Sequence, residues 1–341
     1  MWSLMLLLTA FVSTLVGTSV YRSFAIRRGI IANPNFRSLH QRPLPRGGGL
    51  VLALVCISAI VGLWLLGMIS SSLALVLVGG GTVATLVGFV DDTRQLRPRW
   101  KLLAQGILAA SVLAVFDLQP LIHLPGSPAF LDLGLSWFGL VWLMNLYNFI
   151  DGIDALAATS AIFASTASAV LVVLVGMQKQ LVADIGLEFV FALLAVCSLG
   201  FLIFNWPPAS VFMGDSGSLF LGFAFGALIA KTTVDGQLSI WTWSIIFGYL
   251  AGDTTTTAVV RIFVTNKWYG EHRSHAYQNL ARIWGSHLNV VLGVTLFHIL
   301  WLLPLAVWST LMPVTAPLAA LLAVLPAVFW TLRHGPLRSS S

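Results

Sequence analysis

The chain has 341 residues, of which 58% are hydrophobic and only 9% are charged, and its mean hydropathy is +0.91. Its 12 acidic residues could not cover a soluble surface of this size, so the composition excludes a soluble globular protein, a disordered chain and a disulfide scaffold. The net charge of +6 is explained by membrane topology, because membrane proteins concentrate Lys and Arg in their cytoplasmic loops. We therefore expect the lipid bilayer as a partner and no nucleic acid.

Eleven apolar stretches are candidates for membrane-crossing helices, each of which needs about 20 apolar residues. They predict an all-α, polytopic membrane helix bundle of about 11 transmembrane helices, which forms a single domain over 1–341. In chain order the expected spans are 2–21, 49–67, 72–90, 102–116, 135–150, 156–176, 186–204, 217–232, 238–260, 287–309 and 316–332.

The distribution of basic residues predicts the orientation of the bundle. No positive charge precedes the first span, whereas Arg22, Arg27 and Arg28 follow it, so we expect this span to stay in the membrane with its N-terminus outside. Alternating the loops from that start places all 18 basic residues except Lys179 and Lys231 on the inside. This distribution predicts a cytoplasmic C-terminus and an active site at the cytoplasmic face.

Aspartates gather where the expected spans reach the inner side of the membrane. A carboxylate at such a boundary must be hydrated, paired or bound to a metal ion. Packing does not explain why aspartates from three separate segments arrive at one leaflet. The aspartates concerned are Asp91, Asp92, Asp151, Asp154 and Asp215.

Asp91 and Asp92 are adjacent at the end of the third span and are followed by basic residues. One interpretation is a solvated helix end that carries positive-inside charges. The other is that repulsion between the two carboxylates raises the pKa of one of them and makes it a general base, or that both bind a divalent cation.

Polar residues recur at every third position in 145–154, at Asn145, Asn148, Asp151 and Asp154. Residues with this spacing are neighbours on a helix surface. Burying four polar groups costs free energy unless they have partners, so the pattern indicates either hydrogen bonds between helices or a binding face. Gly152 also allows a break in the helix or a close approach to a ligand.

Asp215 lies between small residues directly before the eighth span. The backbone N–H groups at such a helix N-terminus bind phosphate, while the carboxylate binds Mg²⁺. The alternative is an ordinary helix cap at Asp215 or Ser216.

The last inside loop, 261–286, contains Glu271, His272, Arg273, His275 and Tyr277. The loop lacks cysteine and the H-E-x-x-H pattern, which makes zinc a poor interpretation. A phosphate-binding loop fits the mixture better, and a solvated amphipathic segment is the alternative. The sequence contains no Walker loop, Rossmann fingerprint or G-x-S-x-G turn.

Together these segments resemble the polyprenyl-phosphate N-acetylhexosamine-1-phosphate transferases, a family of integral membrane enzymes also called glycosyltransferase family 4. Five motifs occur in the order that the family shows, and they cover the chain from about 40 to 282. They are HQRPLPRGGG at 40–49, GFVDD at 88–92 with RWKLLAQ at 99–105, NLYNFIDGIDALA at 145–157, NWPPASVFMGDSGSLFLGF at 205–223 and DTTTTAVVRI at 253–262.

The resemblance implies a bacterial inner-membrane enzyme that transfers a sugar 1-phosphate from a UDP-N-acetyl sugar to undecaprenyl phosphate, releases UMP and needs Mg²⁺, with Mn²⁺ as an alternative. It implies Asp215 as the principal metal ligand and Asp91 and Asp92 as paired carboxylates near the phosphates. It further implies that Asp151, Asp154 and Asn148 complete the polar face and that Asn205 and Phe212 hold the uridine. Homodimerisation remains open.

The chemistry of the residues agrees with this activity. The donor diphosphate and the acceptor phosphate are both anions, so their approach requires a divalent cation and basic side chains. The candidates for that role are Lys101, Arg94, His272, Arg273 and His275.

The last loop departs from the His-x-His-His pattern of many relatives, because Tyr277 and Gln278 stand where those relatives have histidines. This version resembles the transferases that begin O-antigen synthesis for lipopolysaccharide, and it predicts UDP-N-acetyl-fucosamine or a related 6-deoxy sugar as the donor. The alternative is a UDP-N-acetylglucosamine transferase for another cell-envelope polymer. A secondary transporter is the alternative from another class, although transporters usually place acidic groups near the midplane of repeated halves.

Overall fold

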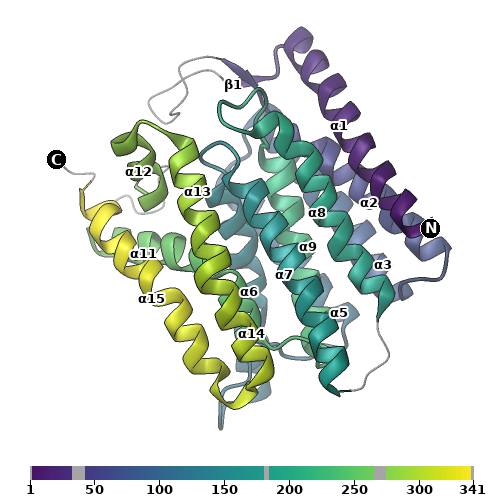
Figure 1. Cartoon of the computed structure of the whole chain (residues 1–341), viewed down its shortest axis with the longest axis vertical. Coiled ribbons are helices and arrows are strands. Elements are labelled where there is room, and N and C mark those ends of the chain that lie inside the picture. The colour runs from purple at the N-terminus through teal and green to yellow at the C-terminus, as the bar shows by residue number, and fades with distance from the viewer. Residues whose placement is uncertain (1, 33–42, 180–183, 265–273, 339–341) are drawn as a thin grey trace.

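Long helices packed side by side make up most of the computed structural model, which describes residues 2–32, 43–179, 184–264 and 274–338 (Figure 1). Two π-helical stretches, Leu75–Gly80 and His298–Leu302, continue into the helices that follow them. The α-helices are α1 (Trp2–Arg28), α2 (Gly49–Leu65), α3 (Ser71–Ala74), α4 (Gly81–Arg94), α5 (Pro98–Val115), α6 (Ala129–Ile150), α7 (Leu156–Lys179), α8 (Ile185–Asn205), α9 (Asp215–Val234), α10 (Ile240–Ile246), α11 (Gly248–Val264), α12 (Ala276–Trp284), α13 (His287–Phe297), α14 (Leu303–Leu311) and α15 (Ala316–His334).

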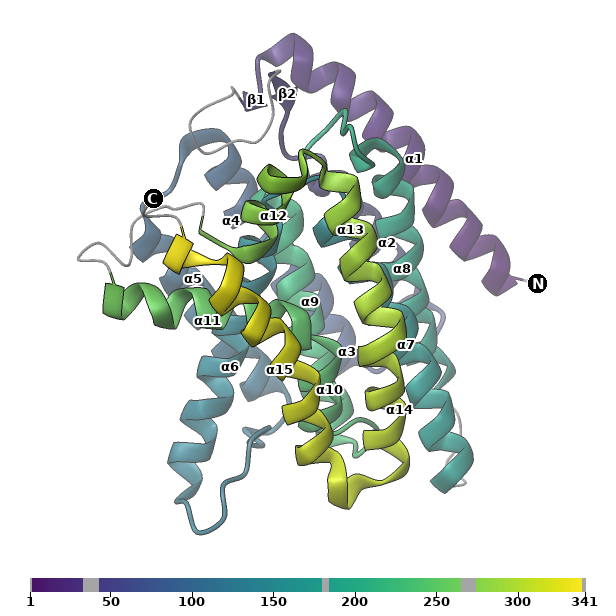
Figure 2. The ribbon, with the colours of Figure 1, turned by 60° about the vertical axis from the view of Figure 1, so that its left-hand side comes forward.

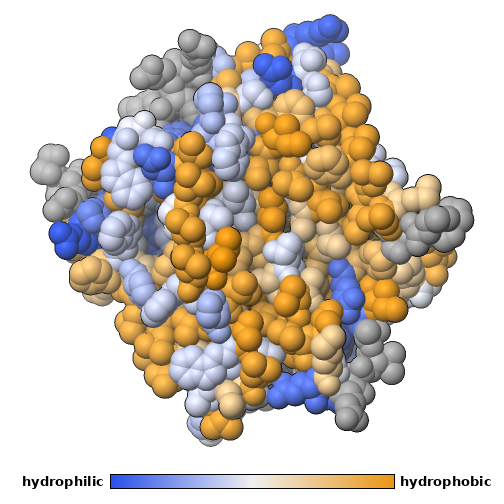
Figure 3. Space-filling view, in the orientation of Figure 1, coloured by the Kyte–Doolittle hydropathy of each residue, from blue (hydrophilic) through white to orange (hydrophobic). Residues whose placement is uncertain are grey.

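The expected all-α, polytopic membrane architecture is confirmed. Within the described residues, eight helical segments are long and apolar enough to cross a membrane, and α2 is a shorter apolar helix. Apolar side chains cover most of the face in Figure 3, while strongly polar residues lie mainly towards its edges. Whether eleven segments cross the membrane, and in which orientation, stays a prediction.

The prediction of a single membrane-crossing helix over 238–260 is wrong. The structure has two helices there, α10 and α11, separated at Phe247, and α11 runs across the long helices instead of along them (Figure 2). Glycine permits this close crossing, because a Cβ atom at Gly252 would lie 2.5 Å from the Cβ atom of Ala327 in α15. The crossing buries the carboxylate of Asp253 between α11, α12 and α15. The apolar pattern of a sequence gives the length of an apolar segment, but it does not show that the chain changes direction within that segment.

Helix α9 lies at the centre of the bundle, and 83% of its most apolar 18-residue stretch is buried inside the protein. Glycines bring its neighbours close to its first turns. A Cβ atom at Gly88 of α4 would lie 2.2 Å from the carbonyl oxygen of Asp215, and one at Gly49 of α2 would lie 2.4 Å from the Cα atom of Gly217. The N-terminus of α9 is therefore held between α4 and α2.

Two short strands and a glycine turn lead the chain into α2. Strand β1 (Ile31–Ala32) pairs antiparallel with β2 (Leu44–Pro45), a pairing that the all-α prediction did not include. Gly47 follows with a φ of +87°, a conformation that glycine adopts without strain. This turn fixes the backbone on both sides of Arg46 at the same end of the bundle as the start of α9.

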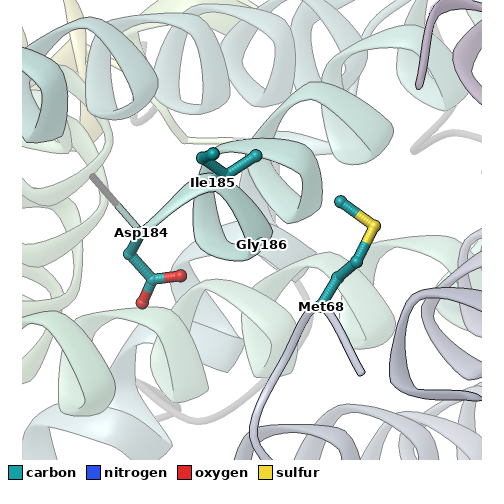
Figure 4. A pocket seen from close by; sticks show the side chains of 4 residues that line it. All are labelled: Met68, Asp184, Ile185 and Gly186. Atoms are coloured by element: carbon teal, nitrogen blue, oxygen red, sulfur yellow. The ribbon is translucent and has the colours of Figure 1, made fainter. Parts of the chain in front are cut away.

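A surface pocket lies towards the other end of α2 and α8. Its lining includes Met68, Asp184, Ile185 and Gly186 (Figure 4). Met68 follows the C-terminus of α2 and Asp184 precedes α8, whereas the aspartates described below lie near the opposite ends of these helices. The pocket is therefore separate from the carboxylate cluster.

Candidate active site

Four of the five predicted aspartates meet where α4 and α6 end and α9 begins. Asp91 and Asp92 occupy the last turn of α4, Asp151 follows α6, and Asp215 is the first residue of α9. Lys101, in the first turn of α5, and Arg46, before α2, place their cationic groups among these carboxylates. The structure thus joins segments that are up to 169 positions apart in the sequence.

Lys101 bridges three segments through its ammonium group. Its Nζ lies 3.3 Å from Oδ2 of Asp91 and 3.2 Å from Oδ1 of Asn148, and it forms an ion pair with Oδ2 of Asp215. Burial disfavours the charge, but the carboxylates of Asp215 and Asp91 outweigh burial and raise the pKa of Lys101 above its ordinary value. Lys101 therefore carries a fixed positive charge in the cluster.

Arg46 is a site residue that the sequence analysis missed. Its Nε lies 2.8 Å from Oδ1 of Asp92, and its Nη2 lies 2.9 Å from Oδ1 of Asp215. The motif at 40–49 contains this arginine, but the sequence does not distinguish it from the neighbouring loop arginines, all of which are expected as positive charges on the inner side of the membrane. Only the three-dimensional arrangement selects it.

Asp92 also binds the backbone at the start of α9. Its Oδ1 accepts a hydrogen bond from the N–H of Asp215 (2.8 Å), and its Oδ2 accepts one from the N–H of Ser216 (3.0 Å). Asp91 differs, because its Oδ1 accepts from the N–H of Leu96 at 2.7 Å while its Oδ2 faces Lys101. The two adjacent aspartates therefore differ in their contacts: Asp92 holds the start of α9, and Asp91 pairs with Lys101.

Asp151 faces the same helix start from the other side. Its Oδ2 accepts a hydrogen bond from the N–H of Gly214 at 3.1 Å. Burial, reinforced by the negative charge of Asp215, raises the pKa of Asp151 well above its ordinary value, although Arg46 opposes the shift. Asp151 thus holds the backbone directly before α9.

Asp154 and Asn205 brace the loops beside the cluster. Oδ2 of Asp154 accepts from the N–H of Ala209 at 3.0 Å and lies 3.3 Å from Nδ1 of His287. The side-chain oxygen of Asn205 accepts from the N–H of Ala155 at 2.9 Å, and its amide donates to the carbonyl of Val211 at 2.9 Å. These bonds tie the loop after α6 to the loop before α9. A uridine contact at Asn205 stays a prediction.

Phe212 is half-buried in the loop before α9, and its backbone joins that loop to the turn before α2. Its N–H donates to the carbonyl of Pro45 at 2.8 Å, and its carbonyl accepts from Gly48 at 2.9 Å. Its predicted contact with uridine is also untested. Of the remaining candidates, Arg94 is exposed at the end of α4, and His272 and Arg273 lie outside the described residues.

Helix α12 places His275 and Tyr277 beside the loop that follows α6. His275 is 4% exposed, and its Nδ1 lies 3.6 Å from Oδ2 of Asp253. Tyr277 is fully buried, and its hydroxyl donates to the carbonyl of Phe149 at 2.5 Å. Asp253 and His287 are contact residues that the sequence analysis did not select, because their roles depend on the crossing of α11 and on the start of α13.

The chemistry of the cluster fits a magnesium ion, because carboxylate oxygens are the ligands that Mg²⁺ prefers. Asp215 and Asp91 are the residues that would hold it. In the part of the chain that the structure describes, however, no group of three or more acidic, histidine or cysteine side chains is arranged around a metal position. Lys101 and Arg46 engage the carboxylates instead, so a metal ion requires a rearrangement of at least one cation.

Comparison with known proteins gives the family. The model of glycosyl transferase family 4 matches residues 74–233, a range that contains Asp91, Lys101, Asp151 and Asp215. A decaprenyl-phosphate N-acetylglucosaminephosphotransferase of Mycobacterium leprae (strain TN) is 30% identical, over 85% of this chain and 79% of the relative. The chain belongs to glycosyl transferase family 4.

Other members of glycosyl transferase family 4 match over similar lengths. A probable undecaprenyl-phosphate N-acetylglucosaminyl 1-phosphate transferase of Bacillus subtilis (strain 168) is 27% identical, over 85% of this chain and 80% of the relative. A phospho-N-acetylmuramoyl-pentapeptide-transferase of Synechococcus sp. (strain WH7803) is 32% identical, over 78% of this chain and 75% of the relative. The family resemblance inferred from the motifs is confirmed at this level.

Proposed function

We propose that this protein transfers an N-acetylhexosamine 1-phosphate from a UDP-sugar to undecaprenyl phosphate at the cytoplasmic face of a bacterial inner membrane. The observation that carries the proposal is the placement of Lys101 and Arg46 among four carboxylates at the ends of apolar helices. The relatives support a reaction of this kind, because one is named as a probable undecaprenyl-phosphate and the other as a decaprenyl-phosphate N-acetylglucosamine phosphotransferase. The positive-inside distribution of Lys and Arg supports the cytoplasmic side.

The reaction joins two anions, and the cluster has the groups to bring them together. An oxygen of the acceptor phosphate attacks the β-phosphorus of the donor, and the bond from that phosphorus to the bridging oxygen breaks. The bridging oxygen leaves with the electron pair on UMP. Lys101 and Arg46 offset the charge of the phosphates, and Asp91 is the candidate base for an acceptor that arrives protonated.

Mg²⁺, when bound, supplies further neutralisation of the phosphate charge. Asp215 is the proposed principal ligand, and Mn²⁺ is the alternative ion. Asp92 and Asp151 hold the backbone at the start of α9 and thereby orient Asp215. The N–H groups of Asp215 and Ser216 already donate to the carboxylate of Asp92, so the start of α9 holds an anionic side chain of the protein itself.

Among the donors we place UDP-N-acetylglucosamine first. The prediction of a 6-deoxy donor rests on Tyr277 and Gln278, which replace two histidines of many relatives. The hydroxyl of Tyr277, however, is buried and donates to the carbonyl of Phe149, so this hydroxyl is not directed at a sugar. The Bacillus and Mycobacterium relatives, which are both named as N-acetylglucosamine transferases, favour N-acetylglucosamine. UDP-N-acetyl-fucosamine for O-antigen synthesis remains the second candidate, because the loop 271–278 departs from the histidine pattern of many relatives.

A donor panel tests the proposal. Purified protein with undecaprenyl phosphate and Mg²⁺ is given UDP-N-acetylglucosamine, UDP-N-acetyl-fucosamine or UDP-N-acetylmuramoyl-pentapeptide, and release of UMP is measured. We expect UMP release with N-acetylglucosamine to be the fastest. Preference for the fucosamine donor restores the O-antigen assignment, preference for the pentapeptide donor moves the protein to another branch of the family, and no release with any donor contradicts the proposed activity.

A further inference from the structure

Arg46 pairs with two aspartates at the start of α9: Asp92, which holds the backbone there, and Asp215, its first residue. The two ion pairs, at 2.8 Å to Asp92 and 2.9 Å to Asp215, use separate nitrogens of one guanidinium group. A guanidinium keeps its positive charge throughout the physiological pH range. In this structure Arg46 is therefore a charged counter-ion of Asp92 and Asp215.

The backbone of Arg46 is fixed while its side chain keeps access to solvent. The N–H of Arg46 donates to the carbonyl of Ile30 at 3.2 Å, and the hydroxyl of Tyr21 donates to the carbonyl of Arg46 at 2.8 Å. The side chain is nevertheless 34% exposed, against 16% for Lys101. The guanidinium can thus change partners without a movement of the chain.

Both carboxylate oxygens of Asp215 are already engaged by cations. Oδ1 pairs with Arg46 and Oδ2 pairs with Lys101. Lys101 also bonds to Asp91 and Asn148, which makes it the more firmly held of the two. If a divalent cation is to reach Asp215, Arg46 is the group that can leave.

We propose that Arg46 is an internal counter-ion that must leave Asp215 before a divalent cation binds there, and that its released guanidinium then binds a phosphate of the substrate. This inference rests on the proposed function, since it takes Asp215 as the metal ligand. A guanidinium forms paired hydrogen bonds with phosphate as readily as with carboxylate. Metal binding and phosphate binding then strengthen each other, as linkage requires.

The first test measures Mn²⁺ binding to the substrate-free protein by electron paramagnetic resonance, which needs no turnover. Arg46→Gln removes the competing charge, so it should bind Mn²⁺ about fivefold or more tightly than wild type, as expected for one nearby charge at a partly exposed site. Arg97→Gln is the matched control, because Arg97 is exposed after α4 and loses the same charge. Equal or weaker Mn²⁺ binding by Arg46→Gln, relative to this control, overturns the inference.

The second test measures the binding of UMP in saturating Mn²⁺. Arg46→Gln should weaken UMP binding about fivefold or more, because the phosphate loses a charge-assisted partner. Unchanged UMP binding would refute the part of the proposal in which the released guanidinium of Arg46 binds a phosphate. If Arg46→Gln does not fold, Arg46→Lys serves both tests: lysine lacks the planar fork, so Mn²⁺ should bind more tightly and UMP more weakly than in wild type.

These measurements are separate from the test of the proposed function. A protein that shows the expected Mn²⁺ and UMP effects but releases no UMP from any donor retains the Arg46 mechanism and lacks the proposed activity. A protein that releases UMP but shows no tightening of Mn²⁺ binding in Arg46→Gln retains the activity and refutes the counter-ion.

Discussion

The carboxylate of Asp92 accepts a hydrogen bond from the backbone N–H of Asp215 at 2.8 Å, so a side chain of α4 caps the N-terminus of α9. The residue before α9 is Gly214, which has no side chain to serve as the cap. The N–H groups at a helix start need acceptors, and a carboxylate is a strong one there. Asp92 therefore orients the first turn of α9 and, with it, the carboxylate of Asp215.

Asp92→Asn should lower stability as well as activity. An asparagine has one acceptor oxygen, so its NH₂ group would face an N–H donor of Asp215 or Ser216, and the ion pair with Arg46 would be lost. Loss of a good cap costs about 1–2 kcal/mol. Thermal unfolding in detergent measures the change, and an unaltered unfolding temperature would show that Asp92 does not hold the start of α9.

Asp215→Asn should reduce turnover by about 10²-fold or more while the protein remains folded, because the amide keeps the shape and loses the charge that pairs with Lys101 and Arg46. UMP release is measured across a range of Mg²⁺ concentrations. Asp235→Asn is the control, since Asp235 follows the opposite end of the same helix and pairs with Lys231. Near-normal turnover of Asp215→Asn at ordinary Mg²⁺ would remove Asp215 from the proposed ligands.

The sequence was sufficient to predict that the aspartates gather at one end of the bundle. Spans of known length alternate in direction, and charged groups avoid the hydrocarbon, so the ends of apolar runs locate Asp91, Asp151 and Asp215. Asp154 shows the limit of this reasoning. It shares the spacing of Asp151, but the loop after α6 turns its carboxylate towards Ala209 and His287.

Contacts set by packing could not be predicted from one sequence. Arg46 reaches the cluster because Gly49 packs against Gly217 and brings the start of α2 to the start of α9. Asp253 reaches α12 because α11 crosses the bundle, whereas the apolar run over 238–260 resembled one straight span. Hydrophobic periodicity gives the length of a helix, but neither the partner of a glycine nor the direction of a helix after a break.

Single cysteines should show that the site opens to one side of the membrane. Positions 97 and 206 are exposed near the carboxylate cluster, and Val314 is 95% exposed in the turn between α14 and α15. We expect a membrane-impermeant maleimide to label 97 and 206 from the cytoplasmic side and 314 from the other side. The native Cys56 and Cys197 are buried and should react little. Labelling of 97 and 206 from opposite sides would refute a single site.

Tyr277→Phe should change the rate and leave the choice of donor unchanged. The substitution removes the hydrogen bond to the carbonyl of Phe149, which holds α12 against the loop after α6, so we expect turnover to fall by about threefold to tenfold, the effect of about one lost hydrogen bond. The ratio of kcat/KM for UDP-N-acetylglucosamine to that for UDP-N-acetyl-fucosamine should stay within about twofold, because the hydroxyl faces the protein. A shift of that ratio by tenfold would place Tyr277 at the sugar and revive the argument for a 6-deoxy donor.

Asp253 should control activity through α12. Its Oδ1 accepts hydrogen bonds from the N–H of Ala276 and from the hydroxyl of Thr331, both at 3.0 Å, and its side chain is 1% exposed. The first of these bonds holds the N-terminus of α12 beside His275, while the second joins α11 to α15. Asp253→Ala removes the oxygen that accepts both bonds and leaves the N–H of Ala276 buried without this partner. Thr331→Val removes one donor and keeps the contact with α12.

We therefore expect Asp253→Ala to lower kcat per folded molecule by about tenfold or more, as a misplaced catalytic segment does, and Thr331→Val to lower it by no more than about threefold. The folded fraction is measured by size-exclusion chromatography, and UMP release is normalised to it, so that lost stability does not count as lost catalysis. Equal effects of the two variants would mean that Asp253 only fastens α11 to α15. A large effect confined to Asp253→Ala would show that the crossing of α11 positions α12, and with it His275, for the reaction.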